Sequence, residues 1–253
     1  MEHIDIEARR LFFERFASDG EKGSLVFIHG SGGDKTKWQK QLDTLPSGYV
    51  GIAIDLPGHG DSTGPTCQSV AEMAEIINAL LQALSLPRPV VVVGHSMGSA
   101  ICLQLALDYP KAIEGMVLIG GGSRMKVMPS LLEDLAQGHN QTSFVPLGFA
   151  QESPRSLVEA EQAACAKVDA ALLLADFMAC NEFDISSQLN RIITPALMIV
   201  GKEDRLTPLK YSEYLQKSIP GSQLLIIPAA GHYVMLEQST SVNQALQDFL
   251  ARL

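Results

Sequence analysis

A serine flanked by two glycines after a buried apolar strand most constrains how this chain can fold. Residues 94–98 have the sequence Gly-His-Ser-Met-Gly and follow four consecutive valines at 90–93. A stretch rich in Ala and Leu with helical periodicity comes next. The pattern predicts a strand, a sharp turn and a helix, with Ser96 in a strained backbone conformation at the turn. Gly94 and Gly98 leave room for the turning chain, because a side chain at either position would clash with it.

Short apolar strands alternate with helical patterns along most of the chain. This alternation predicts βαβ units on a mostly parallel sheet flanked by helices, an α/β architecture. Residues 3–16 are expected to form an antiparallel hairpin or edge strands. Apolar spacing within 70–84 and 242–253 predicts two core-facing helices. The buried strands are expected at 24–29, 50–54, 89–93, 116–119, 196–200 and 223–227.

One long segment breaks this alternation. From about 122 to 189 the pattern is helical, with no convincing strand, and several prolines interrupt it. Connections between strands are normally far shorter, so we interpret this segment as an insertion. The predicted organisation is a core of residues 1–121 and 190–253 and a helical lid, or cap, of residues 122–189 after the sixth strand. The cap covers an apolar cleft, buries a small core of its own, or does both.

Two chemically reactive residues follow late strands, in the order that a serine nucleophile requires. Asp204 comes just after the strand at 196–200, and His232 just after the strand at 223–227. Open α/β sheets carry their sites in loops at the carboxyl ends of the strands. A serine hydroxyl needs a base to take its proton, and that base needs an acid to orient it. The order therefore predicts Ser96 as nucleophile, His232 as base and Asp204 as acid, with Glu203 as the alternative acid.

A glycine-rich turn after the first central strand is a candidate oxyanion hole. Residues 29–33 have the sequence His-Gly-Ser-Gly-Gly. We assign the two donors to the backbone N–H groups of Ser31 and Met97, which would stabilise the charge of a tetrahedral intermediate. Met97 also begins the helix after Ser96, so the positive end of that helix dipole lies beneath the developing charge. Phosphate-binding glycine spacing and a Gly-Lys-Ser/Thr sequence are both missing, which argues against a phosphate site.

These residues resemble the α/β-hydrolase superfamily, and the resemblance spans nearly the whole chain. Residues 55–62, Asp-Leu-Pro-Gly-His-Gly-Asp-Ser, are also similar to the loop after an early parallel strand of that family. The pattern looks most like the small lidded serine esterases, enol-lactonases and carbon–carbon bond hydrolases. The resemblance implies an α/β-hydrolase fold, a triad of Ser96, Asp204 and His232, and no cofactor.

Several relatives fit the chain less well. Haloalkane dehalogenases and epoxide hydrolases of this fold have an aspartate where this chain has Ser96, and epoxide hydrolases also use lid tyrosines. All five tyrosines here fall outside the predicted cap. Carbon–carbon bond hydrolases have Asn where this chain has His95, so this activity is a secondary alternative. The resemblance implies structural roles for His29, His59 and His95, and a solvated position is expected for His139 in the cap.

The resulting functional hypothesis is a serine hydrolase that cleaves carboxylic esters of small, mainly apolar substrates through an acyl-enzyme. The same triad could serve a carbon–carbon bond hydrolase, enol-lactonase, thioesterase or perhydrolase. A ligand-binding sensor on a hydrolase scaffold is the alternative from another class, because fold alone does not choose among them. The expected walls of the substrate cleft are Met125, Met128, Phe144, Phe149 and Phe177.

Composition limits the partners and the location of the protein. The net charge of -9 disfavours nucleic acid and anionic lipid as partners. No apolar stretch approaches the roughly 20 residues that span a bilayer, and the first residues do not resemble a signal peptide. We therefore expect a cytoplasmic protein with a small-molecule substrate, no metal, no membrane association and no obligatory protein partner. Four widely separated cysteines are expected to be reduced: Cys67, Cys102, Cys165 and Cys180.

Overall fold

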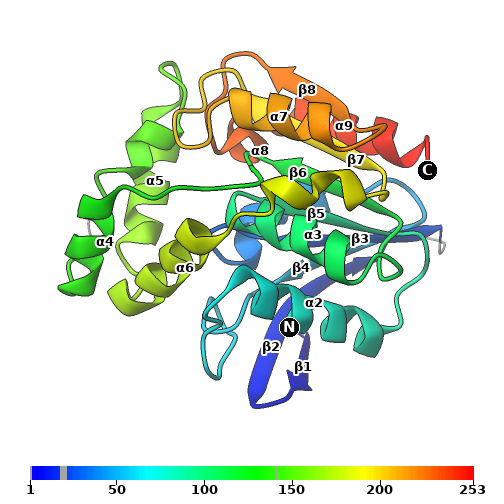
Figure 1. Cartoon of the computed structure of the whole chain (residues 1–253), viewed down its shortest axis with the longest axis horizontal. Coiled ribbons are helices and arrows are strands. Elements are labelled where there is room, and N and C mark those ends of the chain that lie inside the picture. Colours follow the sequence, from blue (N-terminus) through cyan, green and yellow to red (C-terminus); the bar gives the residue numbers. More distant parts are fainter. Residues whose placement is uncertain (1, 18–21, 141) are drawn as a thin grey trace.

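The computed structural model describes residues 2–17, 22–140 and 142–253. The remaining positions of the predicted core and cap, residues 1, 18–21 and 141, lie outside the described residues. The described strands form an 8-stranded sheet in the order β1-β2-β4-β3-β5-β6-β7-β8 (Figure 1). The strands are β1 (Glu2–Ile6), β2 (Arg9–Ala17), β3 (Gly23–Ile28), β4 (Tyr49–Ile54), β5 (Val90–His95), β6 (Gly115–Ile119), β7 (Ala196–Gly201) and β8 (Gln223–Ile227).

The sheet is mostly parallel, as the alternating pattern predicts. β1 and β2 form an antiparallel edge pair, and β2 joins β4 in antiparallel register. All pairings from β4 to β8 are parallel, with Val92 of β5 opposite Val26 on one side and Met116 on the other. Parallel strands place their carboxyl ends at one edge, so the loops that follow β3, β5, β7 and β8 converge there.

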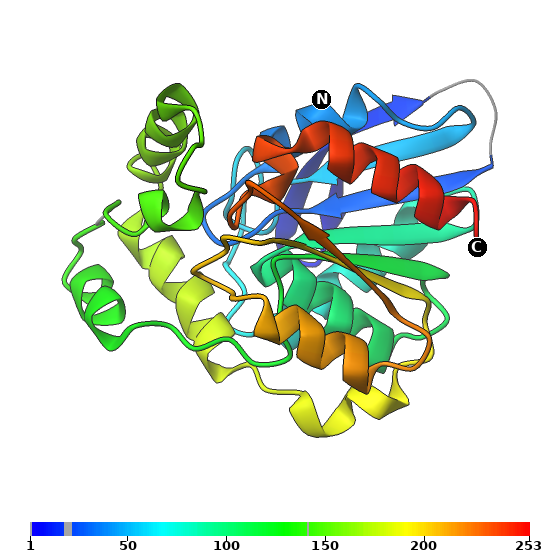
Figure 2. The ribbon, with the colours of Figure 1, turned by 90° about the horizontal axis from the view of Figure 1, so that it is seen from above.

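Helices cover both faces of the sheet, and the four valines of β5 contribute to both cores. Val90 and Val92 face one core, whereas Val91 and Val93 face the other, because successive side chains on a strand alternate. Figure 2 shows α9 and α7 on opposite sides of the sheet. One face packs against α2 (Val70–Leu84), α3 (Met97–Asp108) and α7 (Lys210–Ser218), and the other against η1 (Lys35–Trp38), α1 (Gln39–Leu42), α8 (Val234–Glu237) and α9 (Ser239–Leu250).

The cap, defined here as residues 122–189, is helical, as the sequence predicts. Helices α4, α5 and α6 gather at one end of the molecule in both views (Figures 1 and 2). Within the described part of the cap, β-pairing is limited to an isolated bridge between Arg124 and Asp184. The cap elements are α4 (Pro129–Ala136), η2 (Val145–Gly148), α5 (Arg155–Cys165), α6 (Ala170–Glu182) and η3 (Ser186–Arg191), the last of which extends past the predicted boundary.

The two helices predicted from apolar spacing are both present. The first matches α2 at 70–84, and the second, α9, begins three residues before the predicted start and ends at Leu250. None of the helices built from the described residues is long and apolar enough to cross a bilayer.

Candidate active site

Ser96 occupies the strained turn that the sequence predicts between β5 and α3. Its backbone has φ 54° and ψ −114°, a conformation that an L-residue adopts only at a cost. A Cβ on Gly94 would lie 2.2 Å from the carbonyl oxygen of Gly98, and a Cβ on Gly98 would lie 2.2 Å from that of Ile28. Both glycines are therefore required by close backbone approach, as expected.

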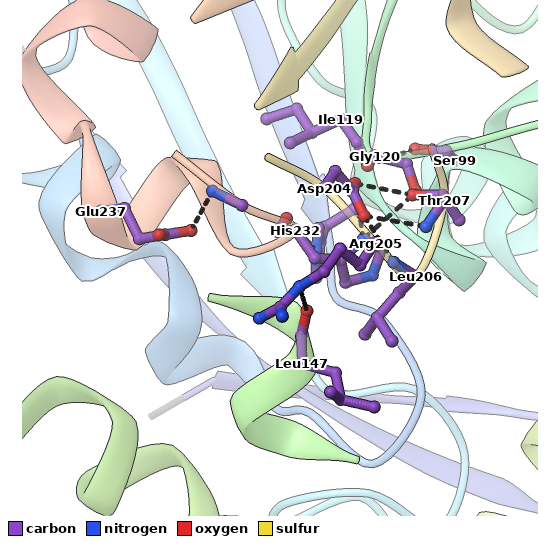
Figure 3. A network of polar contacts seen from close by, with 12 residues as sticks. Ser99, Ile119, Gly120, Leu147, Asp204, Arg205, Leu206, Thr207, His232 and Glu237 are labelled. Atoms are coloured by element: carbon purple, nitrogen blue, oxygen red, sulfur yellow. Dashed lines mark hydrogen bonds and ion pairs between the residues drawn. The ribbon is translucent and has the colours of Figure 1, made fainter. Parts of the chain in front are cut away.

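His232 and Asp204 meet at the carboxyl edge of the sheet. The Nδ1 atom of His232 lies 2.9 Å from Oδ2 of Asp204, with the two side chains 5% and 0% exposed. Oδ1 of Asp204 accepts hydrogen bonds from the backbone N–H groups of Leu206 and Thr207, at 2.9 and 2.8 Å. The Oγ1 atom of Thr207 lies 2.8 Å from Oδ2 of Asp204 (Figure 3). The acid is therefore fixed in one orientation toward the imidazole.

These contacts lower the pKa of Asp204. Burial alone would raise the pKa of this carboxyl, but the charge of His232 and the hydrogen bonds from His232 and Thr207 lower it below its usual value.

Sequence reasoning missed Thr207. An Asp that accepts hydrogen bonds from N–H groups two and three residues later forms an Asx-type turn, and the Asp-Arg-Leu-Thr-Pro sequence carried that signal.

Ser96 and His232 line the same cavity. Within the described part of the chain, Oγ of Ser96 and Nε2 of His232 have no hydrogen-bond partner in the protein. Both atoms are therefore available to each other and to a ligand, and catalytic hydrogen bonds often tighten only when substrate binds. His95 lies beside this pair, and its Nε2 donates to the carbonyl oxygen of His232 at 3.0 Å.

The glycine-rich turn after β3 lies against Ser96. A Cβ on Gly30 would be 3.1 Å from Cβ of Ser96, and Oγ of Ser31 is 3.6 Å from Sδ of Met97. The backbone N–H groups of Ser31 and Met97 find no acceptor among the described residues. Because Met97 is the first residue of α3, the dipole of that helix adds positive potential at this point. Two free donors beside a serine can stabilise an oxyanion.

His29 fixes the start of this turn. Its Nδ1 atom donates to the carbonyl oxygen of Gly30 at 2.8 Å, and its Nε2 atom accepts from the backbone N–H of Leu56 at 3.1 Å. Burial, reinforced by the neighbouring charge of His59, lowers the pKa of His29 to about 3. The ring is therefore neutral at physiological pH, and both nitrogens are used structurally.

A cavity of about 380 Å³ opens above Ser96, between the core and the cap. That volume is within the range of small-molecule sites. Four of the five residues expected to form its walls line it: Met125, Met128, Phe144 and Phe177. The rings of Phe144 and Phe177 pack edge to face, with centroids 5.6 Å apart.

The expectation for Phe149 is wrong. Its ring is buried and stacks on Tyr233, with centroids 4.7 Å apart, and Tyr233 rather than Phe149 lines the cavity. Tyr211 lines it as well. Both tyrosines belong to the core by sequence position, yet the fold brings them under the cap. His139 is exposed and does not line this cavity.

An ion pair crosses the cavity from core to cap, and sequence reasoning missed it. Nζ of Lys37, in η1, lies 2.8 and 2.7 Å from the two carboxylate oxygens of Glu161, in α5. Both side chains line the cavity and are largely buried. The mainly apolar cavity therefore includes a pair of opposite charges that offset each other.

The 3-10 helix η2 of the cap is tied to the loops that carry Asp204 and His232. The guanidinium of Arg205 donates to the carbonyl oxygen of Leu147 at 3.2 Å (Figure 3). The backbone N–H of His232 donates to the carbonyl oxygen of Gly148 at 2.6 Å. These bonds tie both loops to the cap.

Two further carboxylates make similar ties. Glu237 accepts from the backbone N–H groups of Gly231 and Ala150, each at 2.9 Å. Glu203, the alternative acid, accepts from the backbone N–H of Gln151 at 2.9 Å instead of orienting His232. Within the described residues, no group of three His, Cys, Asp or Glu side chains is arranged to hold a metal ion.

Comparison with known proteins agrees with this geometry. The family model described as the alpha/beta hydrolase fold matches residues 23–156, and a TAP-like protein model matches residues 160–253. Because the first match covers more than half of the sequence, the chain belongs to the α/β-hydrolase family.

Individual relatives are similar over most of the chain. Protein ABHD8 of Bos taurus is 28% identical over 263 residues, which cover 98% of this chain and 60% of that protein. The chain thus spans about three fifths of the length of that relative. RutD of Klebsiella pneumoniae, named as a candidate carbamate hydrolase, is 30% identical over 90% of this chain and 91% of its own. The solved structure of a thermophilic esterase is 35% identical, with a TM-score of 0.87 and coverage of 99% and 97%.

Proposed function

We propose that this protein hydrolyses carboxylic esters of small, mainly apolar substrates through an acyl-enzyme formed on Ser96. The observation that carries the proposal is the buried pair of His232 and Asp204, in which His232 lines the same cavity as Ser96 and its Nε2 atom has no partner among the described residues. The methionine and phenylalanine side chains of the cap favour an apolar acyl or alcohol group. The 35% identity to a thermophilic esterase supports the same reaction class.

In the acylation step, Oγ of Ser96 attacks the ester carbonyl while Nε2 of His232 takes its proton. Asp204 holds the tautomer in which Nδ1 is protonated, and its negative charge stabilises the imidazolium. The backbone N–H groups of Ser31 and Met97 donate to the oxyanion that forms on the carbonyl oxygen. The imidazolium then protonates the departing alcohol.

Deacylation uses the same groups in the reverse roles. Water enters the cavity, His232 removes a proton from it, and the resulting hydroxide attacks the acyl carbonyl. The second tetrahedral intermediate collapses, Ser96 recovers its proton from the imidazolium, and the carboxylic acid leaves. No external cofactor is needed for either half of the cycle.

Replacement of Ser96 tests the proposal. Ser96→Ala is expected to lower kcat for p-nitrophenyl esters by a factor on the order of a million, because the triad acts as a unit. A series of p-nitrophenyl esters from acetate to palmitate measures the size of the apolar cavity. A fluorophosphonate probe should label the wild type at one residue, Ser96, in a tryptic digest. Ester hydrolysis at the wild-type rate by Ser96→Ala would overturn the assignment.

Carbamate hydrolysis is a second candidate, favoured by the similarity to RutD over nine tenths of both chains. The same oxyanion donors and triad would act on a carbamate carbonyl, and Lys37 and Glu161 offer polar contacts for its nitrogen substituent. Measuring kcat/KM for an ester and a carbamate with matched alkyl groups distinguishes the two. A higher value for the carbamate would replace the ester assignment.

A further inference from the structure

A second buried histidine–carboxylate pair joins the cap to the core. Oδ2 of Asp176, on α6, lies 2.9 Å from Nε2 of His59, in the loop after β4, and both side chains are 2% exposed. The same oxygen accepts a hydrogen bond from the backbone N–H of Gly32 at 2.8 Å. Gly32 directly follows Ser31, the proposed oxyanion donor. One buried carboxylate of the cap thus contacts the oxyanion turn.

Helix α6 packs on this turn with one face. Leu173, Asp176 and Cys180 are spaced i, i+3 and i+7, so they lie on the same side of the helix. Sγ of Cys180 is 3.8 Å from Oγ of Ser31. A Cβ on Gly32 would lie 2.5 Å from Cδ2 of Leu173, and Gly32 has φ +63°. The helix therefore contacts the turn through three side chains, and among them only Asp176 is charged.

The contacts of His59 place a positive charge beside Asp176. Nδ1 of His59 lies 3.2 Å from the carbonyl oxygen of Pro57, and Nε2 faces Asp176. Both neighbours are acceptors, so the ring needs a proton on each nitrogen and is an imidazolium. Burial alone would lower the pKa of His59, but the charge and hydrogen bond of Asp176 raise it. A paired carboxylate is a stronger acceptor for the Gly32 N–H than a neutral group.

We propose that Asp176 is a positioning residue that holds the oxyanion turn in its active orientation through the Gly32 N–H. The peptide units that carry the Ser31 and Gly32 N–H groups are both rigid planes and meet at Cα of Ser31. Fixing one plane from the cap therefore restricts the other, which carries the oxyanion donor. This links correct packing of α6 to catalysis, and it rests on the proposed function of Ser96.

The test separates kcat from KM in purified Asp176→Ala with p-nitrophenyl butyrate. Removing one oxyanion donor typically lowers kcat by a factor of about 100 to 1,000. Loosening such a donor should cost less, on the order of tenfold to a hundredfold in kcat, with KM within about threefold of wild type. Asp176→Asn keeps an amide oxygen for the Gly32 N–H, so it should recover kcat to within about fivefold of wild type.

Asn181→Ala is the matched control on the same helix. Its side chain accepts from the backbone N–H of Val127 at 3.3 Å, and it lies about 140° around α6 from Asp176. This variant loses one side-chain acceptor of a backbone N–H without touching the oxyanion turn. Its kcat should stay within about twofold of wild type, a bound set by one weak neutral hydrogen bond.

A further variant covers the case in which Asp176→Ala does not fold. Replacing both members of a buried ion pair with apolar groups is often neutral for stability, so Asp176→Leu combined with His59→Phe should fold and still lose kcat by at least about tenfold. A kcat within threefold of wild type in whichever variant folds would overturn the positioning role. A kcat of Asp176→Asn as low as that of Asp176→Ala would also overturn it.

These outcomes are distinct from a failure of the proposed function. If wild type and Ser96→Ala hydrolyse the ester equally, the serine mechanism itself is wrong. If only Ser96→Ala is inactive while all Asp176 variants match wild type, the mechanism stands and the positioning role fails.

Discussion

The two buried histidine–aspartate pairs have the same separation, but they differ in the ring nitrogen that faces the carboxylate and in their environment. His232 and Asp204 lie 2.9 Å apart at the cavity, and His59 and Asp176 lie 2.9 Å apart between cap and core. In each pair a carboxylate oxygen also accepts other hydrogen bonds. Distance and burial alone therefore do not identify the catalytic pair.

The second imidazole nitrogen makes the difference. Nε2 of His232 has no partner among the described residues, and His232 lines the same cavity as Ser96, with which the proposed mechanism has it exchange a proton. Both nitrogens of His59 are engaged, one by Asp176 and the other by the carbonyl oxygen of Pro57. A general base needs a free lone pair within reach of the proton it removes. By this criterion His232, and not His59, is the base of the proposed mechanism.

Replacing the two histidines is the strongest test of this comparison. His232→Ala should lower kcat by a factor on the order of a million, because the base and the nucleophile act together. His59→Gln should lower kcat less than tenfold, because Asp176 still accepts from the Gly32 N–H. Steady-state hydrolysis of p-nitrophenyl butyrate measures both. Comparable losses in the two variants would show that a free nitrogen is not the distinguishing property.

The acids can be compared in the same way, with a smaller expected effect. Asp204→Asn should lower kcat by a factor of about ten thousand, since an amide nitrogen facing Nδ1 selects the wrong tautomer of His232. Glu203→Gln is the neighbouring control, and its carboxylate contacts the Gln151 backbone instead. If Glu203→Gln were the slower variant, the acid would be assigned to the wrong residue.

The smallest effect concerns the stability of the cap–core pair. The pKa of His59 is raised in the folded state, so the pair stabilises the fold fully below pH about 6.5, the ordinary histidine value. This contribution is lost as the pH rises through the raised pKa. The Tm difference between wild type and His59→Gln should therefore be larger at pH 6 than at pH 9.5, as measured by calorimetry.

His139→Gln controls for the loss of a histidine that belongs to no ion pair. This residue is exposed, and its side chain has no ion-pair partner among the described residues. A Tm difference for His59→Gln that grows with pH would mean that the His59 ring is neutral at physiological pH.

Much of the candidate site could be predicted because its parts carry local signals. The turn at Ser96 needs a glycine two positions before it and another two positions after it, and Asp204 and His232 each follow a buried strand. Parallel strands bring such loops to one edge whatever the details of packing. The order of the residues therefore predicted their convergence without any knowledge of contacts.

Residues whose roles depend on which way the side chain points could not be predicted in this way. Phe149 and Phe177 are both cap phenylalanines, yet Phe149 stacks behind Tyr233 while Phe177 lines the cavity. The turn sequence that contains Thr207 could be recognised, but it carries no information about the distance between Thr207 and His232. Only packing decides which side chain of an apolar segment faces a cavity.

From the sequence by itself, local periodicity and turn chemistry predicted an α/β sheet, a helical segment at 122–189, and Ser96, Asp204 and His232 as a candidate triad, and the resemblance carried by these residues implied the α/β-hydrolase fold. Tertiary structure decided which groups join cap to core. His59 and Asp176 are 117 residues apart, and Lys37 and Glu161 are 124 apart. No local pattern links residues at such separations, since their contact depends on how α5 and α6 pack over the sheet edge.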